Sequence, residues 1–92
     1  MAAGSNYRKL ERIVKGFANH RRLEILRLLK TQPELSFEDI SEPLRIGYEN
    51  ASDHLRKMAI AGLILKRNEG KSVRHKLTQR AVDVLTFCKT LE

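Results

Sequence analysis

The fold of this chain is decided by residues 36–63, which read SFEDISEPLRIGYENASDHLRKMAIAGL. Ser36 and Asp39 have the spacing of a capping box, in which a serine and an acid three residues later cap the start of a helix. Apolar side chains then recur at helical spacing, at Phe37, Ile40 and Leu44. The pattern predicts a short helix from Phe37, which Pro43 shortens or bends.

A second helix is predicted directly after a three-residue turn at 45–47. It should run from about Tyr48 to Ala61, with Gly62 ending it as the residue beyond the C-cap. The side chains that it should bury are Ala51, Leu55, Met58 and Ala59. Two helices joined by so short a turn form a helix-turn-helix, here at about 36–62.

A β-hairpin is predicted after this pair, at about 63–77. Its strands should be Leu63 to Arg67 and Ser72 to Leu77, with the turn at 68–71, where Gly70 can take a positive φ. Thr78 should then start a last helix, at about 78–91. A hairpin that follows a helix-turn-helix makes the wing of a winged helix.

Two further helices are predicted before residue 36. The first has an apolar face made of Leu10, Ile13, Val14 and Phe17. The segment from Gly16 to Asn19 should loosen the chain, and Asn19 can cap a central second helix from His20 to about Lys30. The fold class is therefore mainly α with a small β-hairpin, a winged helix-turn-helix of order ααααββα. One domain should span 6–92, preceded by a flexible segment at 1–5.

The charge of the chain is strongly positive and unevenly distributed. Its 92 residues include 18 Lys and Arg and 11 Asp and Glu, so the formal net charge is +7 and the pI is about 10.0. A basic balance of this size indicates a polyanionic partner, most often nucleic acid. Residues 31–55, however, carry six acids and one cation, so an acidic middle separates two basic blocks.

The sequence resembles the winged-helix regulators of the arsenical-repressor (ArsR-like) family from about Phe17 to Thr78. The motifs that carry the resemblance are NHRRLEIL at 19–26, SDHL at 52–55, AGLI at 61–64 and RNEGK at 67–71. The resemblance implies a homodimeric transcriptional regulator of repressor type. It would also place a Cys-x-Cys metal site near 36–38, where this chain has Ser-Phe-Glu, and a basic residue at the position of Asp53.

Glu49 and Asp53 lie near the N-terminal end of the helix that would enter a DNA groove. Helix chemistry is one explanation, since acids are favoured there by the helix dipole and Asp53 can pair with Lys57. A second is base recognition, since a carboxylate can accept a hydrogen bond from cytosine, and a third is contact with a basic protein surface. Tyr48 and Asn50 are further candidates for base contact, with capping and packing as the alternative.

The hairpin supplies positive charge that the helix at 48–61 lacks. A solvated basic face is the ordinary explanation for such a run, but five cations within eleven residues, from Lys66 to Lys76, favour contact with phosphates or the minor groove. Arg56 and Lys57 would extend this patch. The predicted DNA-binding residues are Tyr48, Glu49, Asn50, Ser52, Asp53, His54, Lys57, Arg67, Lys71, Arg74 and Lys76.

The terminal helices carry more apolar surface than a core of this size can enclose from one side, which predicts a homodimer. The predicted interface residues are Leu10, Ile13, Val14, Phe17, Leu85, Cys88 and Leu91. The single cysteine, Cys88, cannot form an internal disulfide, which fits a reducing compartment. We expect it to act as a small apolar core or interface residue, with redox sensing as the alternative.

Several other functions are disfavoured by the sequence. His20, His54, His75 and Cys88 lack metal-ligand spacing, and no glycine-rich phosphate loop or nucleophile elbow is present. We therefore expect no metal, no cofactor and no enzymatic activity. No apolar run approaches the roughly 18 residues of a membrane span, and the start lacks a signal-peptide pattern, so a cytoplasmic protein is expected. The two functions that stay open are sequence-specific binding of double-stranded DNA and a winged-helix module for protein–protein contact.

Overall fold

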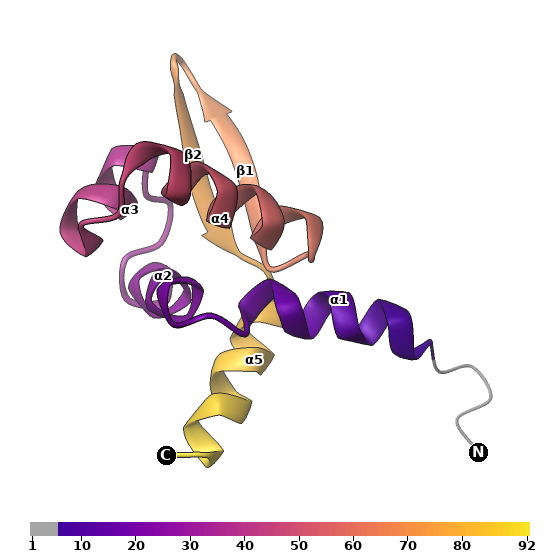
Figure 1. The fold of residues 1–92 in the computed structure, drawn as a ribbon. Helices are drawn as coiled ribbons and strands as arrows, with labels where there is room; N and C mark the ends of the chain where they lie inside the picture. The colour runs from indigo at the N-terminus through magenta and orange to yellow at the C-terminus, as the bar shows by residue number, and fades with distance from the viewer. Residues whose placement is uncertain (1–5) are drawn as a thin grey trace.

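The computed structural model describes residues 6–92, so the segment 1–5 that was predicted to be flexible lies outside the described residues. The order of helices and strands is the predicted ααααββα, which confirms the winged helix-turn-helix. The elements are α1 (Tyr7–Phe17), α2 (His20–Thr31), α3 (Phe37–Leu44), α4 (Tyr48–Ile60), β1 (Ile64–Glu69), β2 (Ser72–Leu77) and α5 (Gln79–Thr90). Figure 1 shows the hairpin projecting behind α4, with α1 and α5 leaving the body in different directions.

The hydrophobic core forms around α2, as the sequence predicted. Asn19 caps this helix by accepting hydrogen bonds from the backbone N–H groups of Arg21 and Arg22. Helices α1, α3, α4 and α5 and strand β2 all contact α2. The largest fully buried side chains are Ile25, Leu26, Leu29, Ile40, Leu55, Met58, Leu63 and Ile64. The apolar spacing in the sequence therefore identified the core-facing positions of α3 and α4.

Helix α1 extends from the body and is mostly exposed (Figure 1). The two helices separate within the expected segment 16–19, but α1 continues through Gly16 to Phe17, so only Ala18 and Asn19 lie between α1 and α2. Gly16 is the buried residue of α1, and a Cβ atom there would collide with the Cβ of Ala61. This glycine serves close packing of α1 on the end of α4 rather than a break in the helix.

The helix-turn-helix is closed by short-range hydrogen bonds that match its sequence signals. The Ser36 hydroxyl accepts from the Asp39 N–H at 3.1 Å, and the Ser36 N–H donates to the Asp39 carboxylate at 3.3 Å. Pro43 lies in the last turn of α3, which ends one residue later. Arg45 then adopts a left-handed conformation at φ 55°, which ends α3. Ile46 is buried and so anchors the three-residue turn in the core.

The wing is an antiparallel hairpin in which Ile64 pairs with Leu77 at one end and Glu69 with Ser72 at the other. The predicted turn at 68–71 was one residue early, because Asn68 and Glu69 are paired within β1. The turn centres on Gly70 and Lys71, and Gly70 has φ 61°. A positive φ at the first central position is the requirement of a type II′ hairpin turn, which glycine meets without strain.

His75 joins the wing to the segment before α3. Its backbone N–H donates to the Leu35 carbonyl at 2.8 Å, and its ring Nδ1 lies 3.0 Å from the same oxygen. Burial of the imidazole lowers the pKa of His75 below the ordinary histidine value. His75 therefore holds the base of the wing on the segment before α3, and its burial favours the neutral imidazole.

Candidate nucleic-acid interface

The N-terminal half of α4 presents its polar side chains to solvent. Tyr48, Glu49 and Asn50 are exposed, while Ser52 and Asp53 are half-buried. The side chain of Asn50 makes no hydrogen bond with any residue of 6–92, and Glu49 forms no ion pair within that range. Base contact was one of the predicted alternatives for Tyr48, Glu49, Asn50 and Asp53, and the first three of these are exposed to a partner.

Tyr48 links the start of α4 to the wing. Its ring packs on Phe37 of α3 at a centroid distance of 5.0 Å, yet 72% of the residue is exposed. Tyr48 also lines a surface hollow of about 420 Å³ together with Lys66 and Lys71 of the wing. The first residue of α4 and two wing lysines therefore face a common space.

The Asp53 carboxylate is paired within its own helix. It lies 2.6 Å from Arg56 Nη2 and 2.9 Å from Lys57 Nζ. Hydrogen bonds from Lys57 and Arg56 hold the pKa of Asp53 below the ordinary aspartate value. This geometry matches the helix-chemistry explanation of Asp53. The carboxylate also compensates the charge of two exposed cations of α4.

His54, a predicted DNA-binding residue, is turned toward α2. Its Nδ1 accepts a hydrogen bond from Arg22 Nε at 3.0 Å, which fixes one edge of the ring. Burial and the nearby charge of Arg22 lower the pKa of His54. Sequence analysis missed this role of Arg22, which also donates to the Lys15 carbonyl at 2.8 Å and so ties α1, α2 and α4 together.

The two wing arginines are held by acids. Arg67 donates two hydrogen bonds to Glu34, one from Nε at 3.0 Å and one from Nη2. The same Nη2 lies 3.2 Å from the carboxylate of Glu69. These hydrogen bonds lower the pKa of Glu34. Arg74 has looser contacts, 3.6 Å to Asp39 and 3.9 Å to Glu69. The sequence could not show these pairs, because Glu34 and Asp39 belong to other segments.

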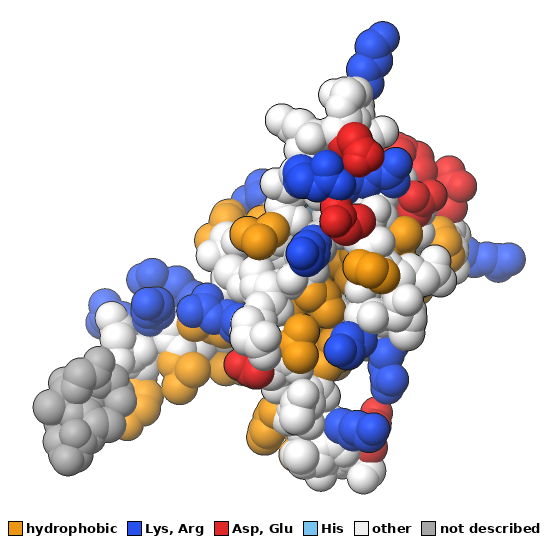
Figure 2. Space-filling view, turned by 180° about the vertical axis from the view of Figure 1, so that it is seen from behind, with side chains coloured by type: hydrophobic (Ala, Val, Ile, Leu, Met, Phe, Trp, Pro, Cys, Tyr) orange, Lys and Arg blue, Asp and Glu red, His pale blue; other side chains and the backbone are white. Residues whose placement is uncertain are grey.

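The wing lysines carry the uncompensated charge. Lys66, Lys71 and Lys76 are exposed and form no ion pair with any residue of 6–92. Figure 2 shows basic side chains on the wing interleaved with acidic ones. Lys66 belongs to the basic run of the hairpin but was not among the predicted DNA-binding residues, and the structure places it beside Tyr48 and Lys71.

The predicted dimer residues lie on surfaces of unequal exposure. Leu10, Val14 and Leu91 are 53%, 40% and 70% exposed, and Phe87, which the sequence analysis missed, is 56% exposed. Ile13, Phe17, Leu85 and Cys88 are half-buried. Figure 2 shows hydrophobic side chains along one edge of α1 and basic ones along the other. Large apolar side chains are thus uncovered on both terminal helices.

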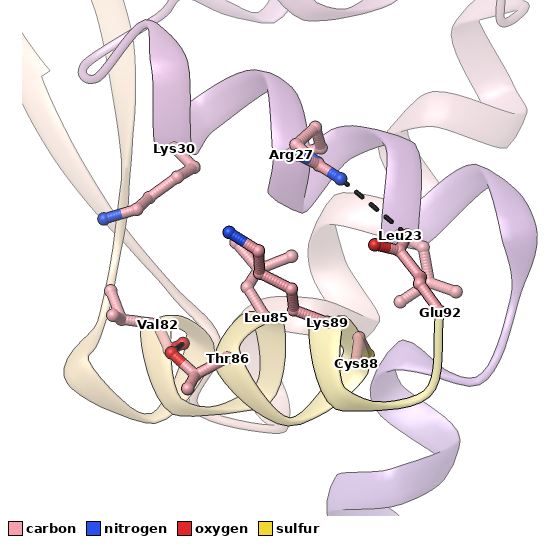
Figure 3. Close-up of a pocket in the computed structure, with 9 residues that line it drawn as sticks. All are labelled: Leu23, Arg27, Lys30, Val82, Leu85, Thr86, Cys88, Lys89 and Glu92. Carbon is pink, nitrogen blue, oxygen red and sulfur yellow. Dashed lines mark hydrogen bonds and ion pairs between the residues drawn. The ribbon is translucent and has the colours of Figure 1, made fainter.

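A second hollow of about 350 Å³ lies between α2 and α5 and contains Cys88 (Figure 3). Arg27 and Glu92 approach each other across it at 3.9 Å, and Lys30 and Lys89 extend along its walls.

Within residues 6–92, no three His, Cys, Asp or Glu side chains are grouped so that they could hold a metal ion. The helices of that range also include none long and apolar enough to cross a membrane.

Comparison with known proteins identifies a family for this chain. The family model described as "Bacterial regulatory protein, arsR family" matches residues 19–66, which include α2, α3, α4 and the start of β1. No curated protein sequence matches the chain significantly.

Solved structures agree with the family match. The homodimeric winged helix-turn-helix DNA-binding domain Mb0332 of Mycobacterium bovis, described as a possible ArsR-family transcriptional regulator, superposes with a TM-score of 0.83 at 27% identity, over 99% of this chain and 89% of that one. The transcriptional regulator HlyU of Vibrio vulnificus gives 0.75 at 30% identity, over 94% and 90%. NolR of Sinorhizobium fredii, at 17% identity and a TM-score of 0.84 over 92% and 85%, shares the fold.

Proposed function

This chain belongs to the ArsR family of bacterial regulatory proteins, and from that premise we propose that it binds double-stranded DNA as a homodimeric transcriptional regulator of repressor type. Helix α4 would enter the major groove with its N-terminal residues first, as recognition helices do. The wing would contact phosphates or the adjacent minor groove. Repression would follow from occupation of DNA that the transcription machinery needs.

The observation that carries this proposal is the space shared by Tyr48, Lys66 and Lys71. A phosphate backbone passing the wing would lie beside the exposed start of α4, so one duplex can meet both elements. The lysines supply mobile point charges, and Asn50 supplies an amide without an internal partner among residues 6–92. Positioning and readout would therefore come from different residues, since phosphate contacts position a protein and base contacts specify the sequence.

Dimerisation would cover the apolar side chains that α1 and α5 leave exposed. Leu10, Val14, Phe87 and Leu91 are the main candidates, because each is at least 40% exposed. Full burial of a large apolar side chain contributes about 1.5–3 kcal/mol, so two copies of this surface would provide a substantial driving force. The Mycobacterium bovis domain is described as homodimeric, which supports the same arrangement here.

A module for protein–protein contact is the second candidate, and the acidic side chains near α4 favour it. Glu38 and Glu49 are exposed, and neither forms an ion pair with a residue of 6–92. A surface of this kind would suit a basic protein rather than a duplex. The two candidates differ in their response to salt, because only phosphate neutralisation releases counterions from DNA.

The test is a binding titration with random duplex DNA and with a selected site, each at low and high salt. The proposed function requires a steep fall in affinity with salt on both duplexes and a large preference for the selected site. Absence of salt-dependent binding would reject it in favour of protein contact.

A pair of variants adds a control. The double variant Lys66→Ala with Lys76→Ala removes two unpaired charges and should weaken binding to both duplexes equally. The slope of log affinity against log salt should fall by roughly one unit for each phosphate that is no longer neutralised. Arg67→Ala removes an arginine that Glu34 and Glu69 already compensate, and it should change DNA affinity less.

A further inference from the structure

A basic groove lies between α1 and the C-terminal end of α4, away from the start of α4. Its volume is about 490 Å³, within the range of roughly 300–1,000 Å³ that is typical of small-molecule sites. Apolar residues of both helices line it, namely Ile13 and Gly16 of α1 with Ile60 and Ala61 at the end of α4. Ile60 is 75% exposed, so a large apolar side chain is available at the groove.

The charged residues of the groove are all cations. They are Lys9, Arg12, Lys15, Arg22, Lys57 and Arg80. Lys15 and Lys57 are paired with Glu11 and Asp53. The other four form no ion pair with any residue of 6–92. The groove therefore concentrates positive charge for which the described part of the chain supplies no acid.

Two of these cations donate hydrogen bonds to neutral acceptors. Arg22 donates to the Lys15 carbonyl at 2.8 Å and to His54 Nδ1 at 3.0 Å, and Arg80 donates to the Ala61 carbonyl at 2.8 Å. The Arg80 guanidinium also occupies the space that a Cβ atom at Gly62 would need. Carbonyl and imidazole acceptors orient the guanidinium groups without cancelling their charge, so the positive charge is held at the groove by neutral groups.

We propose that the basic groove binds a small amphipathic organic anion, with its carboxylate among the groove cations and its apolar body against Ile13 and Ile60. An isolated inorganic anion would leave the apolar lining unused. A DNA backbone would place sugars and phosphates, rather than an apolar group, against the two isoleucines. The combination of fixed guanidinium groups and exposed aliphatic side chains fits a ligand that has both features.

The groove uses a different face of α1 from the one proposed for dimerisation. At helical spacing, Lys9, Ile13 and Gly16 fall on one face, whereas Leu10, Val14 and Phe17 fall on the neighbouring one. Ile13 lies at the boundary of the two sets, so a partner subunit that covers Leu10 and Val14 need not cover Lys9 and Gly16. Ile13, which the sequence assigned to the dimer interface, belongs to the groove lining.

The test is an amide NMR titration of the full chain with sodium octanoate, without DNA, so that the result does not depend on the proposed function. Acetate serves as the head group alone and 1-octanol as the apolar body alone. Octanoate should shift the amide signals of Gly16, Ile60 and Ala61 in a saturable way, and the two partial ligands should shift them far less. Saturable binding at the α2–α5 hollow instead, equal effects of acetate or octanol, or no saturable shift would each overturn the proposal.

Charge variants supply a matched control. Lys9→Ala with Arg12→Ala removes two unpaired cations of the groove and should weaken octanoate binding roughly tenfold. Lys30→Ala with Lys89→Ala removes the same charge from the α2–α5 hollow and should leave the affinity within about twofold. All four side chains are exposed, so the fold should persist, which the NMR spectrum itself reports. An equal weakening by the two pairs would mean that net charge alone attracts the anion, and the groove would not be the site.

Discussion

Replacement of Asp53 by asparagine should increase the salt sensitivity of DNA binding. Asp53 lies 2.6 Å from Arg56 Nη2 and 2.9 Å from Lys57 Nζ, so one carboxylate compensates two cations of α4. Asparagine has nearly the same shape but no charge. The substitution therefore removes a negative charge from the proposed DNA surface and releases both cations for phosphates.

The size of the effect follows from counterion release. Each additional phosphate contact steepens the plot of log affinity against log salt by about 0.9 units. If both released cations reach phosphates, the slope should steepen by about 1.8 units. Between about 50 and 200 mM salt, each contact corresponds to a factor of about 3.5, so the affinity of the variant should fall about 12-fold more than that of the parent over that interval. Its binding at low salt should be tighter than that of the parent.

Glu49→Gln is the matched control for this measurement. Glu49 lies one turn earlier on α4 and is exposed, but it pairs with no cation of residues 6–92. Its replacement removes the same charge without releasing any cation, so the slope should change by less than about one unit. Fluorescence anisotropy with random duplex at four salt concentrations would give both slopes. Equal slopes for the two variants would show that Arg56 and Lys57 do not reach phosphates, and the account of Asp53 would be wrong.

Four further changes have defined outcomes. Gly16→Ala should lower the free energy of unfolding by about 1–3 kcal/mol through overpacking against Ala61, and adding Ala61→Gly should recover part of it in urea melts. Asn50→Ala should weaken binding to the selected site by about 1–3 kcal/mol with little effect on random DNA, and an equal weakening on both would exclude base readout. Leu10→Glu should shift the sedimentation coefficient at micromolar concentration from dimer to monomer, unless α1 lies outside the interface. Because burial lowers the pKa of His75, the unfolded chain takes up a proton at a higher pH than the folded chain. The contribution of His75 to the free energy of unfolding should therefore be complete above pH 6.5, the ordinary histidine pKa, and should fall as the pH drops below that value. His75→Gln should flatten this pH dependence of stability.

The sequence predicted those parts of the fold that depend on neighbours along the chain. The capping box at Ser36, the inward positions of α4 and the glycine that ends it are all local patterns with a definite physical cause. The exposed polar positions of α4 follow from the same periodicity. Where a local signal had two meanings, the prediction was less secure. Gly16 reads as a helix breaker in isolation, and only the position of Ala61 shows that it is a packing residue.

Long-range pairing of polar side chains could not be predicted from the sequence. Arg22 and His54 are 32 residues apart, and Glu34 and Arg67 are 33 apart, yet both pairs form hydrogen bonds. Nothing in a charge run distinguishes an arginine that will find an acid from a lysine that will not. The sequence therefore identified the wing as basic, but it could not show that its arginines are compensated while Lys66, Lys71 and Lys76 have no acidic partner among residues 6–92.

The distribution of compensated charge explains why a chain of net charge +7 has acids at its helix-turn-helix. Glu34, Asp39 and Asp53 each pair with cations of the wing or α4, and cations without an ion pair among residues 6–92 include those of the wing and of the basic groove. On the wing this charge is carried by lysines on flexible stems, which suit a phosphate backbone whose position changes with sequence and bending. In the basic groove, Arg22 and Arg80 are fixed by carbonyl and imidazole acceptors, which suits one anion in one place. The positive charge of the chain can therefore serve a polymer near the start of α4 and the wing, and a small ligand near the other end of α4.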